Sequence, residues 1–232
     1  MNKKYLYFSF ILLVILFISG CKREEKIEVI TDAIKFKEEY ESLNGKKNSR
    51  DIEYRELLIN ENNPFIYSDA KEIIEKMDNE ESFYIYFGSN KCPWCRSIIE
   101  TLIDVANDNN IIKIYYIDIW DKDGKEILRD KYEYNEDNKI VKTYEGTSEY
   151  FTLLDRFSDY LDDYTITNPK TNKIKKLEEK RIYAPTFIYI EKGNIKKLET
   201  GLSESLETSI TELTDEIKEE QKELFTSFFK KD

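Results

Sequence analysis

The stretch that decides the fold is Phe83-Tyr84-Ile85-Tyr86-Phe87-Gly88-Ser89-Asn90-Lys91-Cys92-Pro93-Trp94-Cys95. It begins with five aromatic or apolar residues and continues with turn-forming residues, a pattern typical of a buried strand that ends in a turn. Beyond the second cysteine, apolar side chains recur on one helix face, at Ile98, Ile99, Leu102, Ile103 and Ala106. The two cysteines are therefore predicted to open a helix directly behind a strand.

Three further segments extend this pattern into an α/β domain. The apolar centre of residues 111–119, at 114–117, is predicted as a second central strand. Residues 183–190 place Pro185 at the head of another strand, where its missing N–H does least harm, and a turn at 191–194 leads into a partner strand. Apolar residues at helical spacing predict a closing amphipathic helix over residues 205–229.

The composition excludes several classes of function. The 232-residue chain has 36 basic and 47 acidic residues, a net charge of −11 and no histidine. We therefore expect no nucleic-acid partner, no histidine-based metal site and no imidazole catalysis. With 40% apolar residues, the chain can build one substantial core.

The first twenty residues have the features of a signal peptide. Lys3 and Lys4 precede an uncharged, mostly apolar run over residues 5–18, which is shorter than the roughly 20 residues that span a membrane. Ile18-Ser19-Gly20-Cys21 then resembles the bacterial lipobox, at which cleavage leaves a lipidated cysteine. We expect Cys21 to anchor the protein at the extracytoplasmic face of the cell membrane, with an uncleaved signal anchor as the alternative.

Cysteine usage favours redox chemistry at the remaining pair. Lipidation of Cys21 would leave Cys92 and Cys95 as the only thiols in the chain. A disulfide between them would close a very short loop and restrict the unfolded chain little, so a structural or vestigial pair is the weaker alternative. A zinc site would need two further soft ligands, and the sequence has neither a third free cysteine nor a histidine, so we predict no metal.

Taken together, these segments resemble the thioredoxin superfamily. A strand, a CxxC motif at a helix start, a second strand, an X-Pro step opening an antiparallel hairpin and a closing helix follow in that order over residues 83–119 and 182–230. The resemblance implies a central mixed sheet, and it implies that Pro185 is the cis-proline beside the active site, preceded by Ala184. A proline without a redox role is the alternative.

Residues 63–67, 88–96 and 180–185 more specifically resemble thioredoxin-like lipoproteins of Gram-positive bacteria related to bacteriocin-transport accessory proteins. The chain is longer than the core requires, because far more than the roughly 30 residues of a β-α-β unit lie between Cys95 and Pro185. We predict a helical insertion over about 121–180, before the cis-proline strand, with a helix at 148–164 and a turn around 168–170. The apolar face of that helix either packs on the main sheet or caps a partner-binding site.

An N-terminal extension is predicted to add at least one helix and an edge strand at 54–59. The predicted organisation is thus a signal peptide at 1–20, a lipidated N-terminus with tether and helix at 21–45, and a thioredoxin-like domain at 46–232.

The predicted site performs thiol–disulfide exchange. Cys92 lies where the free N–H groups and dipole of a helix N-terminus stabilise a thiolate, so it is the expected nucleophile and Cys95 the resolving thiol. Pro93 limits the freedom of the loop and Trp94 offers substrate an apolar contact, or both serve local packing alone. Pro185, preceded by Ala184, would line the opposite wall of the substrate-binding site and leave nearby backbone free to pair with an extended substrate.

Proton transfer is less well defined by the sequence. Thioredoxins typically carry a buried acid on the strand before the motif, and residues 83–87 offer none. Glu81 and Asp118 are the candidates to replace it, and Lys91 and Arg96 are expected to add positive charge near the thiols.

We therefore expect a monomeric oxidoreductase without a cofactor that acts on thiols or disulfides of secreted or membrane proteins. The alternative is a lipoprotein adaptor that holds a partner through the same fold without redox turnover. The motif leaves the direction of electron flow open, because the potential also depends on how the fold stabilises the thiolate.

Overall fold

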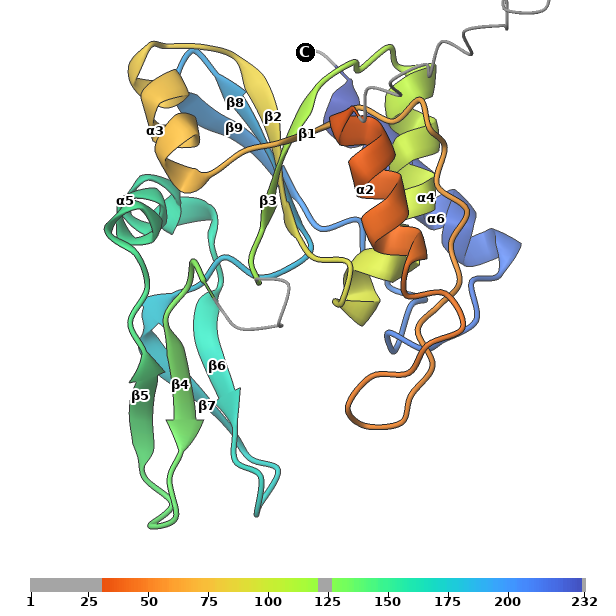
Figure 1. Ribbon diagram of the computed structural model, residues 1–232. Coiled ribbons are helices and arrows are strands. Elements are labelled where there is room, and N and C mark those ends of the chain that lie inside the picture. Colours follow the sequence, from red (N-terminus) through yellow and green to blue (C-terminus); the bar gives the residue numbers. More distant parts are fainter. Residues whose placement is uncertain (1–30, 121–126, 231–232) are drawn as a thin grey trace, which may run out of the picture. The chain divides into compact units, whose positions relative to one another are not determined.

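The computed structural model describes residues 31–120 and 127–230, coloured along the sequence in Figure 1. The predicted signal peptide, Cys21 and the rest of the tether up to residue 30 lie outside these ranges, as do residues 121–126 at the start of the predicted insertion. Residues from Thr31 onward form one compact unit. Within the described ranges, no helix is long and apolar enough to cross a membrane.

A five-stranded sheet forms the centre of this unit, in the strand order β1-β3-β2-β8-β9. Its strands are β1 (Phe65–Tyr67), β2 (Phe83–Gly88), β3 (Ile114–Asp118), β8 (Thr186–Glu191) and β9 (Asn194–Glu199). β1, β3 and β2 run parallel, β8 is antiparallel to β2, and β9 is antiparallel to β8. The predicted mixed sheet is confirmed. Its register pairs Phe87 with Thr186, which brings the end of β2 beside the start of β8.

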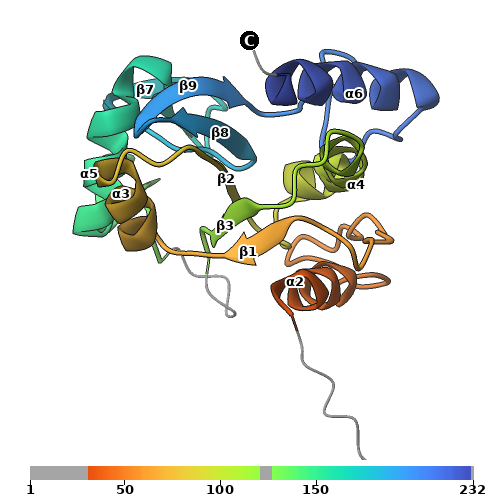
Figure 2. The ribbon, with the colours of Figure 1, turned by 90° about the horizontal axis from the view of Figure 1, so that it is seen from above.

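Helices cover both faces of the sheet, as Figure 2 shows. The first face carries α2 (Asp32–Glu41), α4 (Pro93–Asp108) and α6 (Asp215–Phe229), and the second carries α3 (Ala70–Asp78) and α5 (Ser148–Phe157). Successive side chains of a strand point to opposite faces, so Tyr86 enters the first core whereas Ile85 and Phe87 enter the second. The helix with the cysteines therefore shares its core with Tyr86.

The N-terminal extension is fastened to α4 by Arg96, whose side chain is only 1% exposed. Its guanidinium donates to the Tyr40 carbonyl at 2.7 Å, to Asn44 Oδ1 at 2.9 Å and to the Arg55 carbonyl. A buried charge is tolerated only with such partners. The extension, including the predicted helix now seen as α2, is thus fixed against the helix that begins at the cysteine motif.

The insertion contains the predicted helix and also two small antiparallel sheets that the sequence did not indicate. They are β4 (Lys131–Tyr134) with β5 (Ile140–Tyr144), and β6 (Asp163–Thr167) with β7 (Ile174–Lys180). The predicted turn around 168–170 connects β6 to β7. The two hairpins lie side by side, since Asn168 Nδ2 donates to Asn138 Oδ1 at 2.7 Å and the Tyr164 hydroxyl accepts from the Tyr132 N–H at 3.2 Å (Figure 1).

The apolar face of α5 packs on the main sheet, which decides between the two alternatives for it. Tyr150, Leu153 and Phe157 are each 0% exposed and share a core with Ile85 and Ile117. The predicted C-terminal end of this helix is wrong. The α-helix stops at Phe157, a 3-10 turn covers Ser158–Tyr160, and the next residues enter β6.

Residues 54–59 do not form the predicted edge strand, and β1 takes that place in the sheet. The hydrogen bonds of backbone N–H groups in this segment go to side chains of other segments rather than to a neighbouring strand. Asn44 Oδ1 accepts from the Leu57 N–H at 3.0 Å, and Glu41 Oε1 accepts from the Ile59 N–H at 2.7 Å.

The closing helix is also shorter than predicted, because it begins at Asp215 rather than near residue 205. The Thr214 hydroxyl caps it by accepting from the Ile217 N–H at 3.3 Å. Before the cap, the hydroxyls of Thr208 and Thr211 bond to each other at 2.9 Å and hold a turn. Such hydroxyl groups compete with the hydrogen bonds of a helix, and a prediction from apolar spacing alone does not take this competition into account.

Candidate active site

The position of Cys92 follows from the way β2 ends. After Gly88 the chain turns, and the Cys92 N–H donates to the Ser89 carbonyl at 3.2 Å. Cys92 is the N-cap of α4 and Pro93 the first residue of the helix, where a missing N–H costs nothing. The Cys95 N–H points at Cys92 Sγ at 3.5 Å. The sulfur thus occupies the place that a serine or aspartate oxygen fills in an ordinary cap.

The two sulfurs differ in exposure and in acidity. Both are free thiols, with Cys92 6% and Cys95 0% exposed. The largest effect on the pKa of Cys92 is a hydrogen bond from the Cys95 thiol, which lowers it, whereas burial raises it. The N–H groups of Cys95 and Trp94 and the charge of Arg129 lower it further. Burial, reinforced by its hydrogen bond to Cys92 and by the charge of that neighbour, raises the pKa of Cys95 well above its usual value. Cys92 is therefore the thiol that ionises, and Cys95 stays protonated beside it.

Ala184 and Pro185, which were predicted to line the wall opposite the cysteines, lie beside Cys92. The Ala184–Pro185 peptide bond is cis, and Cys92 Sγ donates to the Ala184 carbonyl at 3.4 Å. The structure thus brings together Cys92 and the X-Pro step from positions far apart in the chain. Trp94 is half-buried and packs on the core of the first face.

Arg129 is a site residue that the sequence did not reveal. It lies in the insertion, is 5% exposed, and its guanidinium donates to the Ile182 carbonyl at 2.9 Å, just before the Ala184–Pro185 step. Lys91 and Arg96 were the predicted sources of positive charge, and of these Arg96 has its guanidinium bound to the N-terminal extension. Because Arg129 is one of many charged residues in the insertion, only its tertiary position distinguishes it.

The two acids considered for proton transfer lie in different places. Glu81 precedes β2, at the opposite end of that strand from Cys92, and accepts from Lys76 Nζ at 3.3 Å. Asp118 is the last residue of β3, and burial raises its pKa to about 6. Hydrogen bonds from the Trp120 N–H and the Ser89 hydroxyl oppose this effect by lowering the pKa. Tyr86, whose hydroxyl lowers the pKa of Cys95, instead shares the buried core of the first face with that thiol.

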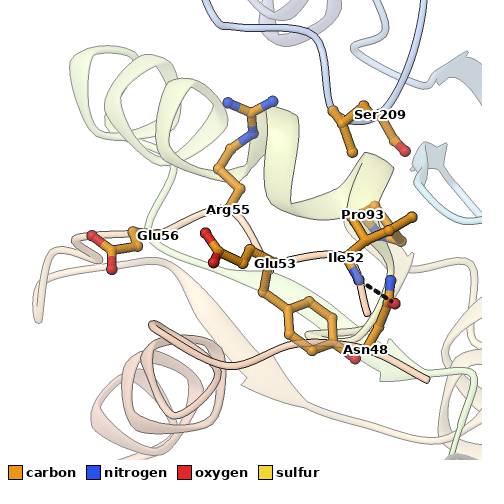
Figure 3. A pocket seen from close by; sticks show the side chains of 9 residues that line it. Asn48, Ile52, Glu53, Arg55, Glu56, Pro93 and Ser209 are labelled. Carbon is orange, nitrogen blue, oxygen red and sulfur yellow. Dashed lines mark hydrogen bonds between the residues drawn. The ribbon is translucent and has the colours of Figure 1, made fainter. Parts of the chain in front are cut away.

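A pocket of about 280 Å³ adjoins the motif on the side of Pro93. Figure 3 shows Ser209 opposite Asn48, with Pro93 and Ile52 between them. Ile210 also lines this pocket and is 64% exposed. The walls come from the N-terminal extension and from the turn before α6, which are joined because the Arg55 guanidinium donates to the Thr211 carbonyl at 2.6 Å.

No group of three or more cysteine, aspartate or glutamate side chains that could hold a metal occurs in residues 31–120 and 127–230.

Comparison with protein-family models finds no match, and comparison with curated proteins finds none. Among solved structures, the chain is similar to the crystal structure of thioredoxin O2 from Arabidopsis thaliana in the oxidized state. The two sequences are 14% identical, the match covers 61% of this chain and 85% of that chain, and the TM-score is 0.31. The mixed sheet, the CxxC motif at the start of α4 and the cis-proline at the head of β8 agree with the prediction, and the chain has a thioredoxin-like α/β fold.

Proposed function

We propose that the protein is a membrane-anchored, extracytoplasmic thiol–disulfide oxidoreductase that exchanges disulfides with secreted or membrane proteins through Cys92-Pro93-Trp94-Cys95. The observation that carries this proposal is the pair of thiols at the start of α4. One caps the helix and has a lowered pKa, and the other is fully buried and has a raised pKa. A structural pair of cysteines would not require such a difference.

The exchange proceeds in two steps. The Cys92 thiolate attacks a substrate disulfide, forms a mixed disulfide and releases one substrate sulfur as a thiolate. Cys95 then loses its proton and attacks Cys92 Sγ, which closes the Cys92–Cys95 disulfide and releases the second substrate sulfur, reduced, to take up a proton. Run in reverse, the same steps oxidise two substrate thiols and leave both cysteines reduced.

The surroundings of Cys92 support a polypeptide substrate. The Ala184 carbonyl accepts from the Cys92 thiol while that thiol is protonated, so it becomes available to a substrate N–H once the sulfur ionises or enters a disulfide. Extended peptides commonly bind through such exposed backbone groups. The pocket beside Pro93, with the exposed Ile210 on its wall, would take an apolar side chain next to the substrate cysteine.

The anchor is proposed to be lipid on Cys21, since each buried methylene contributes about 0.8 kcal/mol. The chemistry balances with substrate thiols and disulfides alone, so we propose that the protein needs no cofactor. We also propose that it is a monomer.

Two substitutions test the redox proposal. Cys92→Ser is expected to abolish both reduction of a model disulfide peptide and oxidation of its reduced form, because the attacking sulfur is lost. Cys95→Ser is expected to trap a mixed disulfide with the peptide, visible on a non-reducing gel and reversed by a small thiol. Undiminished turnover by Cys92→Ser would reject the proposal. Equilibration of the Cys92–Cys95 pair with glutathione would give its reduction potential and hence the favoured direction.

The second candidate function is a lipoprotein adaptor, and the insertion is the feature that favours it. Its small sheets expose Val141, Tyr144 and Ile174, the last with 70% of its surface accessible. Exposed apolar side chains on two adjacent hairpins suit contact with a partner protein. An adaptor would retain its partner after both Cys92 and Cys95 are replaced by serine, whereas loss of the partner in that double variant would exclude this role.

A further inference from the structure

Tyr86 is a buried phenol in the layer directly beneath the cysteine motif. It comes from β2 and is 0% exposed. Its ring lies over the backbone of Gly88, so closely that a Cβ at position 88 would overlap its Cζ and hydroxyl oxygen. The hydroxyl is therefore held at the end of β2, next to the Ser89 backbone, whose N–H also faces the Cys95 sulfur. Glycine at 88 is what permits this approach.

The hydroxyl of Tyr86 has a second partner on the side away from the motif. It lies 3.0 Å from the hydroxyl of Tyr40, which is also 0% exposed and comes from α2. Burial raises the pKa of both phenols well above 10, so both stay neutral at physiological pH. A neutral phenol in such a place is a hydrogen-bond donor and not a base.

Tyr116 provides an internal comparison. It is directly opposite Tyr86 on β3, its ring stacks on that of Tyr86 at a centroid distance of 5.4 Å, and it is 0% exposed. Its hydroxyl lies near Asp118 and helps to lower the pKa of that carboxyl. The two tyrosines thus match in burial and packing, whereas the Tyr86 hydroxyl faces Cys95 and the Tyr116 hydroxyl faces Asp118.

We propose that Tyr86, oriented by Tyr40, donates a hydrogen bond to the Cys95 sulfur whenever that sulfur is a thiolate, in the place of a buried acid. This inference rests on the proposed function, since it concerns the resolving step. Tyr40 donates to the Tyr86 oxygen, which directs the Tyr86 O–H at the sulfur. Tyr86 is then a catalytic residue, because it touches a reacting atom, and Tyr40 is a positioning residue.

The step balances without an added reagent. Cys95 loses its proton, and the resulting thiolate, stabilised by the Tyr86 O–H, attacks Cys92 Sγ. The S–S bond between Cys92 and the substrate breaks, Cys95 is oxidised, and the reduced substrate thiolate takes up a proton. The titratable groups that face Cys95 are Cys92 on its own helix, Tyr40 from α2, Tyr86 from β2 and Tyr116 from β3.

The test uses the full reduced chain in detergent and a one-cysteine peptide carried as a mixed disulfide with thionitrobenzoate. Attack by Cys92 releases the coloured thionitrobenzoate, which has the lower thiol pKa and leaves first, and attack by Cys95 then releases the peptide. Tyr86→Phe is expected to leave the first release unchanged and to slow the second about tenfold, because a hydrogen bond to a charged group is lost. The pH at which peptide release is half-maximal is expected to move upward.

Two further variants separate the hydrogen bond from packing. Tyr40→Phe is expected to slow peptide release less than Tyr86→Phe does, whereas Tyr116→Phe is expected to leave both releases and the pH profile unchanged. Peptide release from Tyr86→Phe within twofold of the wild type, or an equal slowing in Tyr116→Phe, would overturn the inference and leave the proposed function standing. Absence of peptide release from the wild type would instead reject the proposed function, and the inference with it.

Discussion

Cys92 and Cys95 stand in the same helical turn, yet the pKa of Cys92 is lowered by its hydrogen bond with Cys95 and that of Cys95 is raised by burial. The motif, with Pro93 and Trp94, is local, so the sequence is enough to place it at a helix start. Pro185 follows from the order of segments that the chain shares with a known superfamily. The influence of the Arg129 charge on Cys92 and of the Tyr86 hydroxyl on Cys95 could not be predicted, because each depends on how distant segments pack.

Arg129 leads to a prediction at this scale. Arg129→Gln is expected to raise the pKa of Cys92 and to lower its rate of alkylation by iodoacetamide at pH 7 by about twofold, because less thiolate is present. Arg129→Lys keeps the charge and is the matched control, with a rate close to that of the wild type. The pH dependence of alkylation provides the measurement. Equal rates for the glutamine and lysine variants would show that the charge has no part in activating Cys92.

At the scale of elements, predictions succeeded where the pattern is local and apolar. β2, α4, β3 and the β8–β9 hairpin each show clear periodicity and turn residues, and all are present. The hairpins of the insertion were missed because strands such as β7 (Ile174–Lys180) are mostly charged and exposed, so they lack apolar alternation. α3 was missed as well, although Asp69 caps it and Ile73 and Met77 are buried at helical spacing.

The base of these hairpins contains a buried acid with a consequence for stability. Asp130 is 1% exposed, and burial together with the neighbouring Glu179 raises its pKa to about 6. The folded protein then holds a proton that the unfolded chain has already lost, so stability falls as pH rises from about 4 to 6. Asp130→Asn is expected to raise the free energy of unfolding at pH 7.5 by about 2 kcal/mol.

Urea unfolding of both proteins at pH 4.5 and pH 7.5 measures this effect. The difference between the two pH values should be smaller in Asp130→Asn than in the wild type. It should not vanish, because Asp118 has a pKa raised in the same direction and contributes a fall of the same sign. An unchanged or larger difference would contradict the prediction.

At the scale of the whole molecule, the N-terminal extension and the insertion attach to a thioredoxin-like core from different sides. Arg96 ties the extension to α4, and α5 covers the second face of the sheet. The core was predicted from the order of its segments, and the apolar face of α5 from the spacing of its residues. The attachment of the extension depends on the single buried side chain of Arg96, which no local pattern marks.

The proposed anchor gives a prediction at this scale. Cys21→Ser is expected to abolish lipid attachment, so metabolic labelling with a fatty-acid analogue should mark the wild type alone. Because the thiols belong to the compact unit that begins at Thr31, purified Cys21→Ser should reduce or oxidise the model peptide at the wild-type rate. Equal labelling of the variant would refute lipidation at Cys21.

The hydrogen bond from Cys92 to the Ala184 carbonyl joins positions 92 residues apart in sequence, and β2 likewise pairs with β8 across the whole insertion. During synthesis from the N-terminus, Cys92 is exposed long before β8 has been made, and such distant pairings form slowly. Throughout this interval the Cys92 thiol is accessible to other thiols, because the Ala184–Pro185 step does not yet lie beside it. Cys92 is therefore most exposed to unwanted disulfide formation while the chain is being synthesised, and the length of the insertion determines how long this exposure lasts.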